Sequence, residues 1–212
     1  MTVTRRRRAV SDEEKSARRD EIMAAAKTVF ARKGFHATTI ADVAKQAGLA
    51  YGSIYWYFDS KDSLFHALMA VEEQALRSHI ASALAALDQN ADRETAFRTA
   101  VRATFEFFEA DKATVKLLFR DAYALGDRFE KHLGGIYERF IDEIETFIVL
   151  AQERGDVVSA PPRMVAFTLA ALIGQLAHRR MSTDDGVSAD VVADFVVSLA
   201  LDGLRPRRRR YA

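Results

Sequence analysis

Apolar residues recur every three or four positions along most of the chain, which is the spacing of one face of an α-helix. Strand-like alternation is nearly absent, and the 212 residues include only three prolines. The pattern predicts an all-α fold of about nine helices, three short ones followed by longer ones. We expect these helices near residues 16–32, 39–48, 51–58, 60–88, 92–110, 112–124, 127–154, 162–181 and 189–203.

The breaks between the first helices carry recognisable stop and start signals. Gly34 follows the first helix and suits the left-handed conformation that ends many helices. Thr39 with Asp42 three residues later has the spacing of a capping box. Ser60 is a good N-cap for the fourth helix, although Ser63 stands where an acidic residue would complete a box.

The third predicted helix carries four aromatic residues in succession, Tyr55 to Phe58. Consecutive side chains on a helix point about 100° apart, so a short helix cannot bury all four rings. Some of them must face outward, close to Ser53, Gly52 and Lys61. With a helix-turn-helix pattern just upstream, DNA is the first candidate partner for this surface.

About 45 residues carry a family resemblance. The matching positions are Ala25-Ala26, Phe30, Gly34-Phe35, Thr38-Thr39-Ile40, Val43-Ala44, Ala47-Gly48-Leu49, Gly52-Ser53-Ile54-Tyr55, Tyr57-Phe58 and Ser60-Lys61-Asp62. At these positions the segment resembles the DNA-binding domain of the TetR family of bacterial transcriptional repressors. The resemblance implies phosphate contacts from Thr38, Thr39, Tyr55, Tyr57 and Lys61, with Tyr51, Gly52, Ser53 and Trp56 near the bases.

Other interpretations stay open for two of these residues. Tyr57 could be a partly buried core ring, and Lys61 could be an ordinary solvated lysine. The segment between Gly48 and Asp59 also has no Arg, Lys, Asn or Gln, the residues that make strong bidentate base contacts. Base readout would then come from Ser, Tyr and Trp side chains, from Gln46, or from DNA shape.

Charge is distributed unevenly along the chain. Residues 1–62 have a net charge of +4, residues 63–204 of −8 and residues 205–212 of +5, so a polyanion would meet the first part. We predict a basic flexible tail over 1–15, a helix-turn-helix DNA-binding domain over 16–62, a helical effector-binding and dimerisation domain over 63–204, and a basic C-terminal tail over 205–212. The run Arg5 to Arg8 could be a solvated tail or a DNA-contacting arm.

The longer C-terminal part is rich in phenylalanine, which can form a packed helical core. The resemblance implies instead that its helices enclose a pocket for a small effector. Such a pocket would take a largely apolar ligand, fatty-acyl or aromatic. The candidate ligand-binding residues are Phe105, Phe108, Phe119, Tyr123, Tyr137, Phe140, Phe167, Gln175 and His178.

The last two predicted helices offer small or apolar stripes, which the resemblance places in a four-helix bundle between two subunits. The same stripes could also pack within one chain. The candidate dimer residues are Ala166, Ala170, Gly174, Val192, Phe195, Val196 and Leu199.

Together these patterns predict a homodimeric, cytoplasmic, ligand-responsive repressor that binds a double-stranded DNA operator and needs no cofactor. The alternative is a DNA-binding regulator or architectural protein without a small-molecule effector. The chain has no cysteine, no histidine pair at metal-ligand spacing, no glycine-rich phosphate loop and no Gly-x-Ser-x-Gly. We therefore expect no enzyme activity and no catalytic or metal site. The longest apolar run, within residues 167–177, is too short to cross a membrane.

Overall fold

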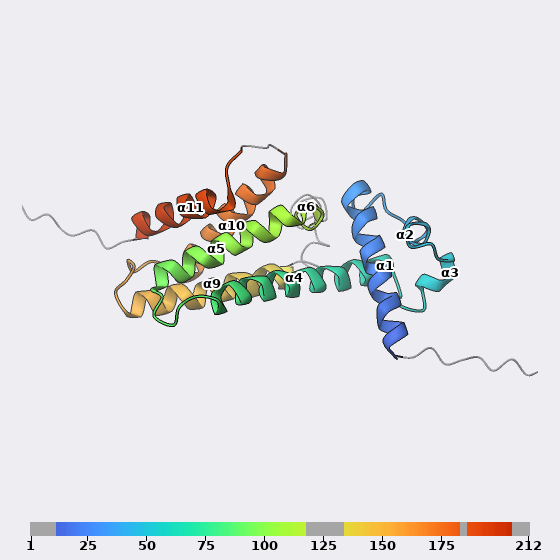
Figure 1. Cartoon of the computed structure of the whole chain (residues 1–212), viewed down its shortest axis with the longest axis horizontal. Helices are drawn as coiled ribbons and strands as arrows, with labels where there is room; N and C mark the ends of the chain where they lie inside the picture. Colours follow the sequence, from blue (N-terminus) through green and yellow to red (C-terminus); the bar gives the residue numbers. More distant parts are fainter. Residues whose placement is uncertain (1–11, 118–133, 183–185, 205–212) are drawn as a thin grey trace, which may run out of the picture. The chain divides into compact units, whose positions relative to one another are not determined.

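The computed structural model describes residues 12–117, 134–182 and 186–204, and every regular element in these ranges is a helix (Figure 1). Nine helices lie in this described part, which confirms the predicted all-α class. The chain divides into two compact units, Met1–Leu68 and Met69–Ala212, and the division falls inside α4 (Lys61–Ala85). None of the helices within the described ranges has the length and hydropathy that a membrane span requires.

Unit 1 contains three helices and the first turns of α4. The helix α1 begins four residues before the predicted start, because three acidic residues fill its first turn and interact favourably with the helix dipole. The third helix is shorter than predicted: it makes a single turn, and residues 55–57 continue as a turn rather than a helix. The bounds are α1 (Asp12–Lys33), α2 (Ile40–Ala47) and α3 (Tyr51–Ile54).

The predicted stop and start signals of unit 1 are confirmed. Gly34 has a φ of 83°, and the Thr39–Asp42 capping box is formed in both directions. The box at α4 is complete after all. Ser60 Oγ accepts from the Ser63 backbone N–H, and Ser63 Oγ accepts from the Ser60 backbone N–H, each at 3.0 Å. The Ser63 hydroxyl therefore accepts the hydrogen bond that an acidic side chain accepts in a standard capping box.

Aromatic rings form the centre of the unit 1 core. The Phe65 ring meets Phe30 edge-on at 5.3 Å between centroids and Phe35 at 4.8 Å. Around these three rings lie buried aliphatic side chains from all four helical segments, which fixes α1, α2, α3 and the start of α4 against one another. The aliphatic residues are Ile22, Val29, Val43, Ile54 and Leu64.

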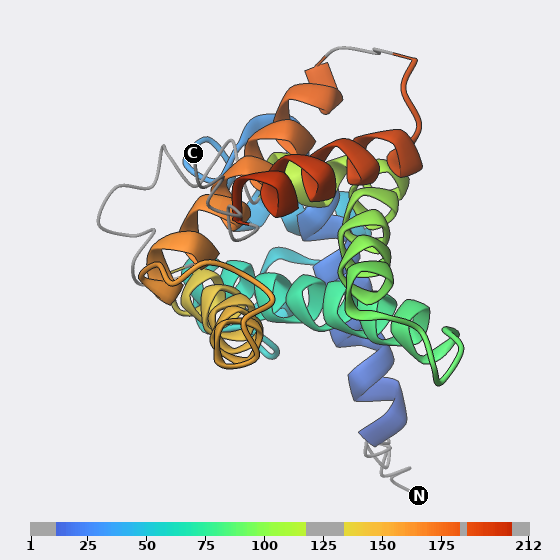
Figure 2. The ribbon, with the colours of Figure 1, turned by 90° about the vertical axis from the view of Figure 1, so that its left-hand side faces the viewer.

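Unit 2 is built from antiparallel helix pairs. The helix α5 packs along α11, and α9 packs along α10 (Figure 2). The predicted helices over 112–124 and 127–154 run into residues 118–133, which lie outside the described ranges, so only their outer parts can be compared. The bounds are α5 (Arg93–Ala110), α6 (Lys112–Val115), α9 (Gly135–Glu153), α10 (Pro162–Ser182) and α11 (Ala189–Leu204).

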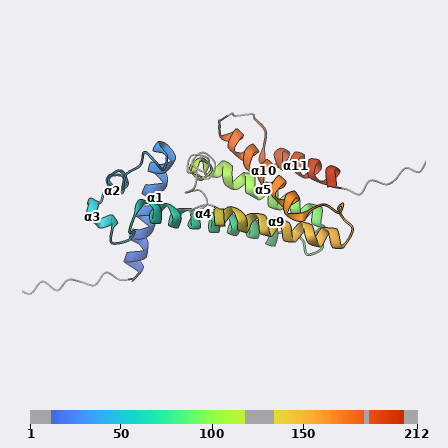
Figure 3. The same cartoon turned by 180° about the vertical axis from the view of Figure 1, so that it is seen from behind.

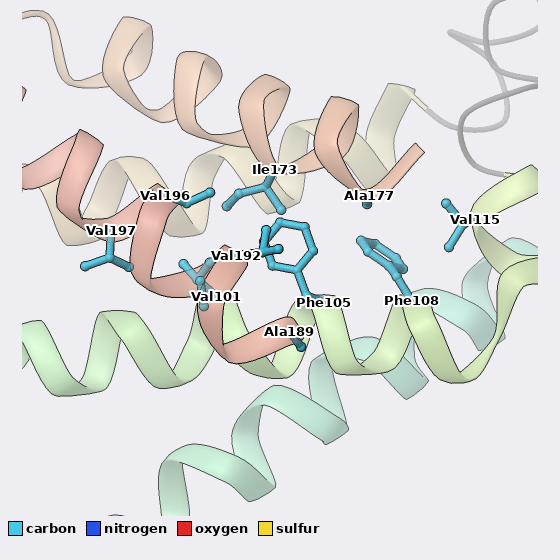
Figure 4. Packing of buried hydrophobic residues seen from close by; sticks show 11 residues of the cluster. Val101, Phe105, Phe108, Val115, Ile173, Ala177, Ala189, Val192, Val196 and Val197 are labelled. Atoms are coloured by element: carbon cyan, nitrogen blue, oxygen red, sulfur yellow. The ribbon is translucent and has the colours of Figure 1, made fainter. Parts of the chain in front are cut away.

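The largest core of unit 2 lies where α5, α6, α10 and α11 meet. Phe105 and Phe108 of α5 point between α10 and α11, as Figure 4 shows. Both rings are almost fully buried, so replacing either by alanine would open a cavity in a close-packed interior. The other members of this cluster are Val101, Val115, Ile173, Ala177, Ala189, Val192, Ala193, Val196 and Val197.

Ion pairs join α4 to α9, which run side by side in Figures 1 and 3. Glu73 of α4 accepts from Arg139 at 2.6 Å and from Arg77 at 3.2 Å, and Arg77 also pairs with Glu143. The Arg139 guanidinium, then Arg77, holds the pKa of the Glu73 carboxyl below its ordinary value. These partly exposed pairs fix the register of α4 against α9 more than they add stability.

Candidate functional site

The segment from Tyr51 to Phe58 presents one face to solvent and buries the other. Ile54 and Phe58 point into the core of unit 1. Trp56 is 80% exposed, Tyr51 55% and Tyr55 44%. The Tyr57 ring is half-buried. Large exposed rings grouped on one short element are unusual on a surface that contacts only water.

The two tyrosines of this face form a pair. Their hydroxyl oxygens lie 2.8 Å apart, and their rings meet edge-on with 5.4 Å between centroids. The hydrogen bond with Tyr51 raises the pKa of the Tyr55 phenol above its ordinary value. One hydroxyl must donate to the other, which leaves the pair with a single hydroxyl hydrogen to offer to an outside acceptor.

Gly52 lies between these tyrosines, and the fold gives no reason for its being glycine. It does not have a positive φ, and a Cβ at this position would meet no protein atom within 4 Å. A glycine therefore leaves the backbone of α3 open to close approach from outside. Ser53, the next residue, is half-buried.

The structure uses the two threonines before α2 internally. Thr38 is only 1% exposed, and its Oγ1 donates to the Gly34 carbonyl at 2.7 Å. The Thr38 side chain is thus bonded within unit 1, and a phosphate contact from this residue stays a prediction. Thr39 is exposed, and its Oγ1 accepts from the Asp42 backbone N–H at 3.2 Å as the cap of α2.

Lys61 also turns inward. Its Nζ donates to the carbonyls of Phe35 and Thr38, each at 2.8 Å, and to that of His36 at 3.3 Å. The same ammonium lies 4.5 Å from the centroid of the Phe35 ring. An ammonium has three N–H donors, so three carbonyls take all of them. The pattern signalled a functional lysine but could not reveal that its partners are backbone atoms of the α1–α2 turn.

Asp42 carries a second electrostatic link inside unit 1. Its carboxylate lies 2.5 Å from Lys33 Nζ at the end of α1 and accepts from the Thr39 backbone N–H at 3.0 Å. The Lys33 hydrogen bond, followed by those of Thr39, lowers the pKa of Asp42 well below its ordinary value. The carboxylate thus ties the end of α1 to the start of α2.

The candidate ligand residues of unit 2 do not form one group. Phe105 and Phe108 lie in the α5–α11 core. Tyr137 and Phe140 pack on a separate cluster of Ile141, Ala166 and Ala170. Phe167 is 54% exposed and only touches the edge of Tyr137, at 6.2 Å between centroids. Gln175 is exposed, His178 is half-buried, and Phe119 and Tyr123 lie outside the described residues.

The candidate dimer residues separate into two sets. Ala166, Ala170 and Gly174 are buried within the chain, and the two alanines pack against α9. Val192 and Val196 are buried against α5. Packing inside one chain therefore accounts for five of the seven, while Phe195 and Leu199 face outward. With Met164, Phe167 and Val191 they are the more than half exposed apolar residues of α10 and α11, which we call the exposed apolar face of these two helices.

Comparison with known proteins shows which family and which relatives this chain resembles. The family model of bacterial regulatory proteins, tetR family, matches residues 22–68. The transcriptional activator FasR of Mycolicibacterium smegmatis is 27% identical over 88% of this chain and 83% of its own length. The transcriptional repressor KstR2 of Rhodococcus jostii is 28% identical over 90% of this chain and 92% of its own.

Solved structures share the fold beyond the N-terminal domain. The regulator FadR from Bacillus subtilis, solved in complex with stearoyl-CoA, superposes with a TM-score of 0.70 at 18% identity, over 87% of this chain and 98% of its own. The family match covers the helices that carry the exposed aromatic face, and the similarity to the relatives extends through most of unit 2. The chain thus carries the N-terminal helix-turn-helix domain of the tetR family over residues 22–68, and over most of its length it is similar to TetR-family transcriptional regulators.

Proposed function

We propose that this regulator represses transcription as a homodimer, binding a DNA operator through the exposed face of α3 and leaving it when a fatty-acyl effector binds unit 2. The observation that carries the proposal is the aromatic face of residues 51–56 with the open glycine in its middle. A major groove admits a helix whose backbone comes close to the base edges. Gly52 permits that approach, because no side chain stands between backbone and DNA.

The residues of this face suit contacts that do not depend on bidentate amides or guanidinium groups. The Trp56 indole and the tyrosine rings offer apolar surface to thymine methyl groups, and the paired hydroxyls offer one donor to a base or a phosphate. Ser53 adds a small hydroxyl beside the open backbone. These contacts would discriminate only moderately between base sequences, so DNA shape would supply part of the specificity.

Dimerisation is supported by the exposed apolar face of α10 and α11. Five large apolar side chains from two neighbouring helices face solvent there, each more than half exposed. Exposed apolar groups that gather on adjacent helices mark interaction surfaces. A second copy of the chain packing the same face would make an isologous four-helix interface. Two DNA-binding units would then read a palindromic operator with half-sites about 34–36 Å apart.

The effector proposal rests on the similar proteins and on the apolar interior of unit 2. KstR2 is a repressor, and the FadR structure of the same fold holds stearoyl-CoA. The apolar, phenylalanine-rich interior of unit 2 suits a long acyl chain better than a polar ligand. A ligand shifts a DNA-binding equilibrium only by its differential affinity for the two states, and a hundredfold release requires about 2.7 kcal/mol.

The DNA proposal is tested by selecting 30-base-pair duplexes from a random library with the full chain. We expect enrichment of a palindrome, bound by two chains with a dissociation constant of about 10⁻⁸ M or tighter at physiological salt. Failure to enrich any duplex would overturn the DNA-binding proposal.

The effector proposal is tested by titrating stearoyl-CoA, with free coenzyme A as control, into the complex with the selected duplex. Release by the acyl thioester alone is expected. If acyl-CoA, free fatty acids and aromatic acids all leave the complex intact, a regulator without a small-molecule effector stands instead.

A further inference from the structure

The guanidinium group of Arg19 lies over the ring of Phe58, with its Cζ 4.9 Å from the ring centroid. Phe58 is the last residue of the segment that carries the exposed aromatic face, and its ring is buried. A cation over an aromatic face is attracted by the negative charge of the ring, so the ring holds the guanidinium in place. Arg19 Nη1 also lies 3.9 Å from the sulfur of Met23, one turn further along α1.

Two neighbouring arginines on α1 differ in their charge partners. Arg18 is neutralised by Glu21, whose carboxylate lies 2.5 Å away. Within the ranges that the structure describes, no carboxylate oxygen lies within 4.0 Å of the Arg19 guanidinium. On this exposed part of α1, Arg18 thus has an ion-pair partner, whereas Arg19 has none among the described residues.

The DNA-facing segment needs a cation from another element. It has no Arg or Lys between Gly48 and Asp59, and the Lys61 ammonium is taken up by three carbonyls. Protein–DNA complexes are anchored largely by cations on the phosphates beside the reading element. Arg19 stands at the C-terminal end of that segment, because its guanidinium lies over the ring of Phe58.

We propose that Arg19 is a phosphate-contacting residue, which Phe58 positions at the edge of the α3 face. The inference rests on the proposed DNA-binding function and adds to it an anchor on a different helix. The rigid ring beneath a planar guanidinium lowers the entropy lost when it meets a phosphate. The guanidinium has five N–H donors, and those not directed at the Met23 sulfur suffice to bind one phosphate in a bidentate manner.

The test compares Arg19→Gln with Arg18→Gln in the full chain, using the duplex selected by the wild-type protein. Affinity is measured at salt concentrations from 50 to 200 mM. Each phosphate contact contributes about 0.9 to the slope of log affinity against log salt. Arg19→Gln should lower the slope by about one, so its disadvantage against wild type should shrink about threefold over this range. Arg18→Gln should leave the slope unchanged, and Arg19→Lys should restore it.

The outcomes separate the two proposals. A wild-type chain that selects no duplex would overturn the DNA-binding function and this inference with it. A wild type that binds, together with an unchanged slope in Arg19→Gln, would overturn the role of Arg19 alone. Equal losses of slope in both glutamine variants would also overturn it, because they would reflect the general charge of α1. Thermal unfolding of each variant is the control that checks whether the glutamine substitutions leave the fold intact.

Discussion

The ammonium of Lys61 lies 2.8 Å from the carbonyl oxygen of Thr38, which it reaches across 23 positions of the chain. Together with the contacts to Phe35 and His36, this bond fastens the start of α4 to the turn between α1 and α2. These carbonyls lie in a turn outside the helices, and the lysine gives each of them a charged donor, in addition to the Thr38 N–H that reaches the Phe35 carbonyl at 3.4 Å. The position of α2 and α3 therefore depends on a side chain that the sequence places outside both helices.

We expect Lys61→Ala to act on stability more than on phosphate binding. Loss of hydrogen bonds from a charged donor should lower the free energy of unfolding by about 2 kcal/mol. The salt slope of operator binding should stay at the wild-type value, because three backbone carbonyls hold the ammonium within unit 1. Denaturant unfolding measures the change in stability, and DNA affinity at several salt concentrations measures the slope. A slope reduced by one with unchanged stability would return Lys61 to the phosphate contacts.

The tyrosine pair gives a prediction about coupling. Since Tyr51 and Tyr55 share one outward hydrogen, either hydroxyl alone can still supply it. Tyr51→Phe and Tyr55→Phe should each weaken DNA binding by less than about 0.5 kcal/mol, and the double variant by about 1–1.5 kcal/mol. Fluorescence-anisotropy titrations with the selected duplex measure the binding free energy of the wild type, the two single variants and the double variant. Strictly additive losses would mean that the two hydroxyls act independently.

Replacing Gly52 by alanine should change the stability of the chain and its affinity for DNA in opposite directions. Because a Cβ would meet no protein atom there, Gly52→Ala should raise the stability of the chain by about 0.5–1 kcal/mol, as alanine favours a helix. The same methyl should obstruct the close approach to DNA and weaken operator binding at least about tenfold. The matched control is Gly135→Ala at the start of α9, which should leave DNA binding unchanged. Normal binding by Gly52→Ala would show that α3 does not approach DNA through this point.

The α2 cap predicts a dependence of stability on pH. The pKa of Asp42 lies below its ordinary value of 3.8, so its ionised form stabilises the fold above that pH, and the stabilisation disappears as the pH falls below it. Asp42→Asn should be less stable than wild type at pH 7, and the difference should shrink on acidification to pH 2. Unfolding curves at several pH values would show this, and a constant difference would contradict it.

The hydroxyl of Thr39 should also stabilise the cap of α2 at pH 7. Thr39→Ala should lower the free energy of unfolding by about 1 kcal/mol, whereas Thr39→Ser keeps the acceptor and should cost little. Denaturant unfolding at pH 7 compares the two variants. Equal stability of both would mean that the hydroxyl does not stabilise α2.

Phe195 should be central to self-association. Phe195→Glu places a charge on the exposed face of α11 and should raise the dimer dissociation constant about thirtyfold or more, the factor for a loss of about 2 kcal/mol. Leu150→Glu is the control, because Leu150 is an exposed apolar residue of α9, outside this face. Analytical ultracentrifugation at micromolar concentration compares them. A stable wild-type monomer would refute the proposed dimer.

The successes and failures of the sequence analysis have a common cause. The all-α class and the Thr39 cap were predictable, because each depends on spacing along the chain. The inward turn of Thr38 and Lys61 was not, since their partners are backbone carbonyls, which every residue has. The stripe of Ala166 and Ala170 looks the same whether the helix packed on it belongs to its own chain or to another.

Trp56 is the chain's single tryptophan, and it stands 80% exposed on the face proposed to meet DNA. The intrinsic indole emission of the protein therefore comes entirely from that face. A solvated indole emits at long wavelength, and stacking against or burial beneath a base would shift or quench the signal. The native chain can thus report operator binding and effector-driven release in real time, through a fluorophore that needs no label and no substitution.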